Sequence, residues 1–321
     1  MIKKLLITGA NGQIGSELAL EFRKIFGNEN VLITDVSTNF KASLAATGPV
    51  EQLDILDTER LSRLIDRYQI DGIIHLAALL SAVGEKNPQM AWNINMNGTL
   101  NVFETAREKG IKRIFVPSSI GVFGTTTPLD ETPQDTILQP ATMYGITKVC
   151  GELLGEYYVK KYGMDIRGLR FPGIISNATY PGGGTTDYAV AIYYDAVKYG
   201  RYECFLSENT MLPMMYMPDC LKATVDLFMT PQHKLKHHTG FNLAAFSVTP
   251  KMMAESIRKF MPSFQISYKP DFRQAIADSW PNTIDDSAAR EEWGWKPDYD
   301  LDIMTEDMLK VIGEKHKKGL I

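Results

Sequence analysis

A tyrosine and a lysine stand four residues apart in Tyr144-Gly-Ile-Thr-Lys148, at the start of an expected helix, so both side chains lie on one face. A free tyrosine has a pKa of about 10 and is a poor base at neutral pH, whereas a nearby lysine cation favours the phenolate. Ser119 ends an expected strand 25 residues earlier, at the sheet edge where ligands bind, and the adjacent Ser118 competes for its role. Together they predict removal of a proton from a substrate hydroxyl, with Tyr144 as the general base.

A glycine-rich turn, Gly9-Ala-Asn-Gly12-Gln-Ile-Gly15, follows the first expected strand and opens a helix. Its glycines let the backbone approach a pyrophosphate, and the helix N-terminus offers free N–H groups to that anion. Asp35 ends the second strand 20 residues after Gly15, where a carboxylate accepts hydrogen bonds from an adenosine ribose and repels a 2′-phosphate. Asp54, after the third strand, suits the adenine edge. The pattern therefore predicts NAD as the cofactor, in preference to NADP.

Short apolar strands alternate with helical patterns through the N-terminal half of the chain. This alternation predicts a parallel sheet with helices on both faces, a Rossmann-type doubly wound α/β fold. We expect strands at 5–7, 31–33, 50–53, 72–76, 113–116 and 166–169, and helices at 14–25, 58–68, 90–109 and 145–162. We expect an NAD-binding domain over 1–175, with a return to the sheet at about 208–246, and a smaller C-terminal substrate-binding lobe over 176–207 and 247–321.

The composition narrows the class of partner. The formal net charge is -4 and no long basic run occurs, so nucleic acid is not expected. No stretch approaches the ~20 apolar residues of a membrane span. Cys150, Cys204 and Cys220 form no close pair in the sequence and predict reduced thiols in the cytoplasm. The adjacent His237 and His238 have no cysteine near them, so no metal site is expected.

Five segments occur in an order that resembles the extended short-chain dehydrogenase/reductase family, which includes UDP-galactose epimerase. They are the glycine turn, His75-Leu-Ala-Ala78, Asn95-Met-Asn-Gly-Thr99, Pro117-Ser-Ser-Ile-Gly-Val-Phe-Gly124 and the Tyr144–Lys148 pair. The resemblance implies that Ser119 is the catalytic hydroxyl, that Lys148 also holds the nicotinamide ribose and that Asn95 supports the site. The residues expected to bind the cofactor are Gly9, Asn11, Gly12, Gln13, Ile14, Gly15, Asp35, Asp54, Leu76, Ala77, Ala78, Asn95, Tyr144, Lys148 and Pro172.

One branch of this family is more similar than the others. Its nucleotide-sugar enzymes usually carry Arg-x-x-Asn after the sixth strand, whereas this chain has Leu169-Arg-Phe-Pro-Gly-Ile-Ile-Ser176, without that asparagine. This segment, residues 79–82, the loop 181–189 and residues 285–297 are similar to the short-chain L-threonine 3-dehydrogenases. The resemblance implies NAD-dependent oxidation of L-threonine at its secondary hydroxyl to 2-amino-3-oxobutyrate, with release of NADH. The substrate-binding residues implied are Ser81, Ser119, Tyr144, Thr185, Thr186 and Asp187.

The glycines at 182–184 predict a loop that orders over the substrate. Two other functions stay open: a nucleotide-sugar epimerase or dehydratase with tightly bound NAD, and a non-catalytic dinucleotide-binding regulator, although such regulators often lose the tyrosine or the lysine. The family further implies a homodimer in which helices 90–109 and 145–162 of two copies form a four-helix contact. Tetramers also occur in the family.

Overall fold

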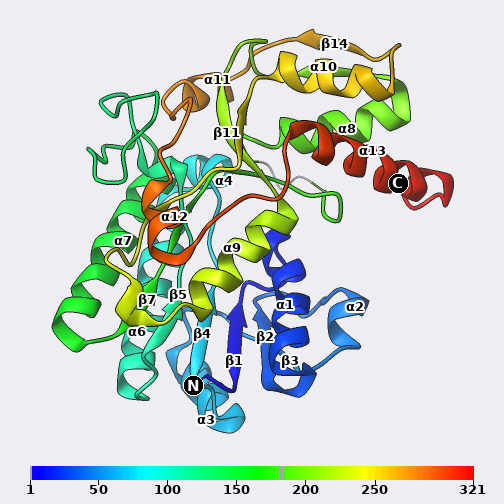
Figure 1. Ribbon diagram of the computed structural model, residues 1–321. Coiled ribbons are helices and arrows are strands. Elements are labelled where there is room, and N and C mark those ends of the chain that lie inside the picture. The colour runs from blue at the N-terminus through cyan, green and yellow to red at the C-terminus, as the bar shows by residue number, and fades with distance from the viewer. Residues whose placement is uncertain (1, 181–183) are drawn as a thin grey trace.

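Six parallel strands form the central sheet of the computed structural model, which describes residues 2–180 and 184–321 (Figure 1). In the order β3-β2-β1-β4-β5-β7, they are Val50–Gln52, Val31–Asp35, Leu5–Thr8, Gly72–His75, Arg113–Phe115 and Asp165–Arg167. Every neighbouring pair is parallel, as the apolar strands predict. The strand order reverses between β1 and β4, which opens a crevice at their carboxyl ends.

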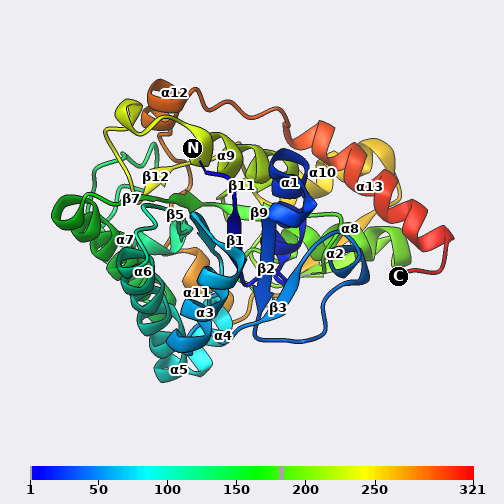
Figure 2. The ribbon, with the colours of Figure 1, turned by 90° about the horizontal axis from the view of Figure 1, so that it is seen from below.

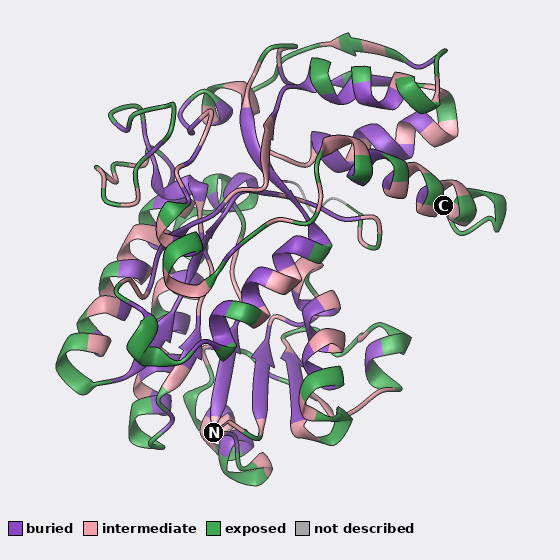
Figure 3. Cartoon of the chain, viewed as in Figure 1, coloured by how far each residue is buried: buried purple, intermediate pink, exposed green. Residues whose placement is uncertain are grey.

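Helices cover both faces of this sheet (Figure 2). Side chains alternate along β1, so that Leu5 and Ile7 join one buried core and Leu6 joins another. Helices α1 (Gln13–Phe26) and α9 (Met217–Met229) close the first core. The second core is closed by α3 (Thr58–Tyr68), α6 (Gly98–Glu108) and α7 (Met143–Tyr162). Figure 3 shows the strands buried between these layers. The doubly wound Rossmann-type fold is thus confirmed.

Two short sheets extend the molecule beyond β7. In the first, β8 (Leu169–Phe171) lies between β6 (Ser118–Ser119) and β12 (Phe241–Asn242), parallel to both. In the second, β11 (Leu212–Tyr216) pairs parallel with β9 (Gly173–Ile175) and antiparallel with β13 (Phe246–Val248). Strand β11 lies within residues 208–246 and belongs to this separate three-stranded sheet, not to the central one.

A third core lies beyond the carboxyl ends of the central strands, in the upper part of Figure 1. Its elements are α8 (Tyr188–Tyr199), β10 (Arg201–Cys204), α10 (Pro250–Phe260), β14 (Gln265–Tyr268), α11 (Arg273–Ala277) and α13 (Leu301–Lys317). Strands β10 and β14 pair parallel. Three further short helices are α2 (Ala42–Ala45), α4 (Ser81–Lys86) and α12 (Ser287–Trp293). This region sits over the crevice, so a ligand bound at the central sheet also meets its side chains.

The helix expected over 90–109 spans residues 88–108, but a wide turn interrupts its regular α-helical hydrogen bonding. The segment begins with α5 (Pro88–Trp92), widens into a π-helical turn (Asn93–Asn97) and continues as α6. The π-turn places Asn95 inward, where its side-chain oxygen accepts from Leu79 N at 2.8 Å and its amide donates to Leu79 O at 3.1 Å. Such wide turns often mark functional positions, and these long-range hydrogen bonds leave no trace in local helical periodicity.

His75, at the end of β4, is buried against the sheet. Its Nδ1 lies 2.8 Å from Thr8 Oγ1, and its Nε2 lies 3.3 Å from Thr99 Oγ1. Burial, together with the nearby Lys148 cation, lowers the pKa of His75 from its usual 6.5 to about 3. The folded chain therefore holds a neutral imidazole, while the unfolded chain binds a proton below about pH 6.5.

This difference predicts an acid-dependent loss of stability. Because the folded-state pKa of His75 is depressed, stability is complete above pH 6.5 and falls as the pH drops toward 3. Between pH 8 and pH 5, His75 should cost the folded state about 2 kcal/mol. Urea unfolding of wild type and His75→Asn at both pH values measures this cost. Between pH 8 and pH 5, the free energy of unfolding should fall by about 2 kcal/mol more in the wild type than in the variant. Equal losses would show that the buried imidazole is not the sensor.

Candidate active site

The glycine turn has no room for side chains. Gly9 has φ +69°, and a Cβ added there would lie 2.6 Å from the backbone nitrogen of Ala77. A Cβ on Gly15 would lie 2.5 Å from the carbonyl oxygen of Gly9. Gly12 is the N-cap of α1, and its backbone together with Gln13 and Ile14 faces the crevice. Bare backbone and a helix N-terminus therefore stand where an anionic group would bind.

Asp35 closes the next part of the crevice at the end of β2. Its Oδ2 accepts from Asn11 N at 3.0 Å, and its Oδ1 accepts from Ser37 N at 3.1 Å. The carboxylate lies beside a slot of apolar and backbone groups near the exposed Asp54. The slot is lined by Val36, Leu53, Ile55 and Leu56. The carboxylate of Asp35 could accept hydrogen bonds from a ribose, and the slot could hold a flat base.

One cavity of about 530 Å³ joins these features to the tyrosine and the lysine. Thirteen of the fifteen residues expected to bind the cofactor line it; the other two are Asn11 and Asn95. Asn11 holds Asp35 through its backbone nitrogen. Asn95 ties the segment after β4 to α7, because its amide also donates to Thr147 Oγ1 at 3.1 Å. Asn11 and Asn95 therefore do not line the cavity. Each instead holds neighbouring residues that do.

Tyr144 and Lys148 lie in the first two turns of α7. Thr142 caps this helix, accepting from Gly145 N at 3.0 Å, and so fixes where the first turn starts. Tyr144 packs over Gly121, where an added Cβ would lie 3.2 Å from the ring. Lys148 Nζ lies 5.5 Å from the centre of that ring and donates to Pro117 O at 2.7 Å. The lysine is thus held by the strand end rather than by the phenol.

Burial governs the protonation of both groups. It raises the pKa of Tyr144 to about 12, and a hydrogen bond with Ser119 only partly opposes this. Burial also lowers the pKa of Lys148 to about 8, while the negative charge of Glu152 opposes that shift. In this ligand-free state the Lys148 cation does not bring the tyrosine pKa into the neutral range. Desolvation of the phenolate outweighs a cation whose ammonium bonds Pro117.

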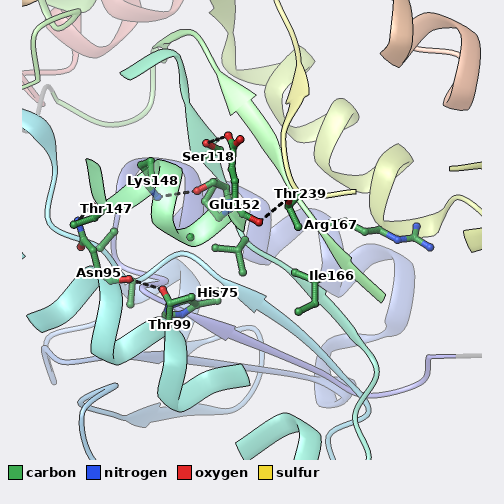
Figure 4. A pocket seen from close by; sticks show the side chains of 15 residues that line it. His75, Asn95, Thr99, Ser118, Thr147, Lys148, Glu152, Ile166, Arg167 and Thr239 are labelled. Atoms are coloured by element: carbon green, nitrogen blue, oxygen red, sulfur yellow. Dashed lines mark hydrogen bonds between the residues drawn. The ribbon is translucent and has the colours of Figure 1, made fainter. Parts of the chain in front are cut away.

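The two serines of β6 point to opposite sides. Ser119 faces the large cavity, and its Oγ accepts from Gly121 N at 3.1 Å while bonding the tyrosine. The buried Ser118 hydroxyl donates to Glu152, on the side shown in Figure 4. Because neighbouring residues of a strand alternate in direction, only Ser119 is placed to bond Tyr144. The structure thereby separates two residues that sequence reasoning left in competition.

The side chains expected to bind substrate also line the large cavity. Thr185 is 1% exposed, and among the residues that the structure describes its Oγ1 finds no hydrogen-bond partner. Asp187 Oδ2 accepts from Gly184 N at 2.6 Å and so braces this segment. The buried Ser81 opens α4 on the opposite wall. Of the expected mobile loop, residues 181–183 lie outside the described residues.

Sequence reasoning missed two contributors to this region. Trp280, just after α11, lines the cavity from the upper part of the molecule and is 6% exposed. Glu152 follows Lys148 by one helical turn and sits behind it, buried. The spacing Tyr144, Lys148, Glu152 was visible as a signal, since residues four apart share a helix face. Trp280 gives no local signal of its own.

Several other features are quickly described. Cys150, Cys204 and Cys220 are free thiols. His237 pairs with Glu292, with Nδ1 2.5 Å from Oε1. Within residues 2–180 and 184–321, we find no group of three or more His, Cys, Asp or Glu residues arranged to hold a metal ion. Over the same residues, no helix combines the length and apolar character needed to cross a membrane.

Comparison with known proteins places this architecture. Residues 5–243 match the NAD dependent epimerase/dehydratase family. An uncharacterised epimerase/dehydratase of Staphylococcus haemolyticus is 49% identical over 317 residues, covering 98% of this chain and 99% of that protein. The structure of L-threonine dehydrogenase from Clostridium difficile superposes with a TM-score of 0.95 at 51% identity, covering 98% of each chain.

L-threonine 3-dehydrogenase from Trypanosoma brucei superposes with a TM-score of 0.94 at 42% identity, covering 99% of this chain and 98% of that one. These similarities span both the central sheet and the upper region, so they concern the whole molecule and not only its dinucleotide-binding half. Together with the glycine turn, Asp35 and the Tyr144–Lys148 pair, they show that the chain belongs to the NAD dependent epimerase/dehydratase family.

Proposed function

We propose that this chain is an NAD-dependent L-threonine 3-dehydrogenase, which oxidises the secondary hydroxyl of L-threonine to 2-amino-3-oxobutyrate and releases NADH. One observation carries the proposal: a single cavity joins the glycine turn, the Tyr144–Ser119 pair and the buried hydroxyl of Thr185. Support also comes from the matched L-threonine dehydrogenases, which cover nearly the whole chain at 51% and 42% identity.

The residues along the cavity fit the cofactor. Backbone N–H groups at the start of α1 suit the pyrophosphate, and Asp35 suits the ribose hydroxyls. The apolar slot beside Asp54 suits the adenine. NAD, when bound, supplies the acceptor for the hydride. The protein's part is to hold the substrate carbon in line, to keep water out and to take up the proton.

Tyr144 takes the proton of the substrate hydroxyl in this proposal. With a pKa of about 12, its phenol is protonated in the ligand-free state. The Lys148 ammonium favours the phenolate during the reaction, and the ring of oxidised NAD, when bound, would supply a second positive charge. Ser119, which bonds the tyrosine, steadies the substrate oxygen as it becomes a carbonyl. The phenol proton leaves to solvent as the phenolate forms. The phenolate then takes the hydroxyl proton, and the substrate hydrogen would leave as a hydride to bound NAD, so charge and atoms balance.

The substrate is a small zwitterion and needs a few well-placed polar groups. Thr185 offers a buried hydroxyl that has no hydrogen-bond partner among the described residues, and such an orphan costs stability unless a ligand satisfies it. Ser81 lies across the cavity, while Thr186 and Asp187 extend the same wall. We assign these side chains to the substrate, and the upper region that carries Thr185 to substrate binding.

The proposal includes a homodimer. Large apolar side chains are exposed along α5, α6 and α7; Leu153, for example, is 65% exposed. The set comprises Met90, Trp92, Leu100, Ile146, Leu153 and Tyr157. Apolar side chains gathered on neighbouring helices of a folded protein suit burial against a second copy, here as a four-helix contact. The free thiols fit a reducing compartment, and we place the protein in the cytoplasm.

The first prediction tests the reaction. Purified protein mixed with NAD and L-threonine should produce free NADH, measured by absorbance. Tyr144→Phe should lower kcat by about a hundredfold or more, because the ring still packs while the proton acceptor is lost. NAD affinity should change little. Interconversion of UDP-glucose and UDP-galactose, without reaction of threonine, would instead establish an epimerase.

The second prediction concerns Asp35. Replacing it with alanine removes the charged acceptor for the ribose hydroxyls, which should lower kcat/KM for NAD by roughly tenfold to a hundredfold. NADP should lose little or gain, because a repelling carboxylate is gone. Steady-state kinetics with both cofactors measures the ratio. A wild type that uses both cofactors equally would contradict the assignment.

The third prediction concerns Thr185. Thr185→Val keeps the shape of the side chain but removes its hydroxyl, so the KM for threonine should rise roughly tenfold. Thermal stability should stay level or increase, because a buried group without a partner is removed. Thr179→Val is the matched control, since its hydroxyl bonds Lys41 outside the cavity. An unchanged KM in Thr185→Val would exclude the hydroxyl from substrate binding.

A further inference from the structure

Three ionisable side chains follow one another along a single face of α7. Tyr144, Lys148 and Glu152 are spaced four residues apart, which aligns them along the helix. The mechanism uses the first two. Glu152 is 7% exposed, and a carboxylate with so little contact with water must be held by specific partners.

Glu152 is held by a buried ion pair and by a serine hydroxyl. Arg170 donates from Nε to Oε1 at 3.0 Å and from Nη2 to Oε2 at 2.9 Å, which is a two-pronged ion pair. The Ser118 hydroxyl donates to the same carboxylate. Gly240 allows the close approach, since a Cβ there would lie 2.6 Å from Oε2. The carboxylate is therefore fixed in position and negatively charged.

Glu152 and Lys148 line the same small cavity, of about 30 Å³, beneath the strand end (Figure 4). Among the described residues that line it, Glu152 is the one carboxylate. Arg167 also lines the cavity, but in Figure 4 its guanidinium points away, and it is bonded to Asp165 and to carbonyls at the end of α9. Arg170 is not among the lining residues. The cavity thus sets an ammonium and a carboxylate facing one low-dielectric space.

We propose that Glu152 is a positioning residue for the reaction, which favours the charged form of Lys148 and holds the strand end next to Ser119 through Ser118. The proposal rests on the proposed function for its kinetic consequence. It does not depend on that function for the effect on Lys148 itself. Burial disfavours the ammonium, and a fixed negative charge one helical turn away offsets part of that cost.

The other ionisable groups around Lys148 do not replace Glu152. Tyr144 is protonated, and His75 on β4 is neutral because burial lowers its pKa to about 3. Asp165 on β7 is occupied by Arg167 and Arg113. Glu156, one turn beyond Glu152, accepts from Thr239 at 3.2 Å and is partly exposed. Removing Glu152 alone should therefore change the charge state of the lysine.

The direct test measures Lys148 without any substrate. Trace acetylation by acetic anhydride across a pH series, read at the Lys148 peptide by mass spectrometry, reports the midpoint at which the amine loses its proton. In Glu152→Gln the midpoint should fall by about one pH unit. Glu152→Asp, which keeps the charge, should retain a midpoint near that of wild type. Glu156→Gln is the matched control on the same helix and should leave the midpoint in place.

The kinetic test follows the pH dependence of kcat/KM for threonine. Because the ammonium is lost at lower pH in Glu152→Gln, the alkaline limb of the profile should move to lower pH by the same amount. A purely structural role would lower the rate without moving the limb. If the Lys148 midpoint moves and the limb does not, the proposed part of Lys148 in the reaction fails while its control by Glu152 stands.

Two results would overturn the inference. One is an unmoved Lys148 midpoint in folded Glu152→Gln. The other is the same midpoint shift in Glu152→Asp, which would point to packing and not charge. If the single variant does not fold, Glu152→Gln with Arg170→Gln leaves no buried charge alone. Its midpoint should still lie below that of wild type, because Glu152 and not Arg170 faces the cavity with Lys148; a wild-type midpoint would refute the proposal.

Discussion

The buried ion pair between Glu152 and Arg170 is the interaction on which the site depends. Arg170 also donates to Gln134 O at 2.9 Å and to Asn242 Oδ1 at 3.0 Å, so the pair joins α7 to β8, β12 and the loop before α7. Breaking such a pair leaves an uncompensated buried charge, which is strongly destabilising. The helix that carries the tyrosine and the lysine is thus fixed to the sheet by polar contacts deep inside the fold, in addition to the bonds that hold its first turns.

The same burial that makes these contacts strong also decides protonation. Burial by the surrounding protein disfavours the charged forms of Tyr144, Lys148 and His75. A site built in this way is quiet without ligands: the phenol is protonated and the imidazole is neutral. In the proposed reaction, a bound ligand with a positive charge would favour the phenolate, so no strong base would face water beforehand.

The sequence was informative where chemistry depends on local spacing. The glycine turn, Asp35, and the four-residue interval from Tyr144 to Lys148 follow from backbone geometry, so motif and structure agree on the crevice and on the parallel sheet. Contacts between distant segments were out of reach. Asn95 in the π-turn hydrogen-bonds Leu79, which lies 16 residues away. Ser118 donates to Glu152, which also pairs with Arg170. Trp280 reaches the cavity from the upper core. Contacts between residues so far apart in the chain leave no periodic signal in the sequence.

Gly173 lies at the start of β9 and lines the large cavity next to Thr186. A Cβ there would lie 2.3 Å from Met214 Sδ and 2.9 Å from Thr186 Cβ. Its φ is not in the left-handed region, so volume and not backbone freedom demands the glycine. A substitution of Gly173 by alanine would displace the side chain of Thr186 or of Met214. Selection would therefore conserve this glycine as strictly as a catalytic residue. Conservation at this position would reflect the lack of space for a side chain and not a part in the chemistry.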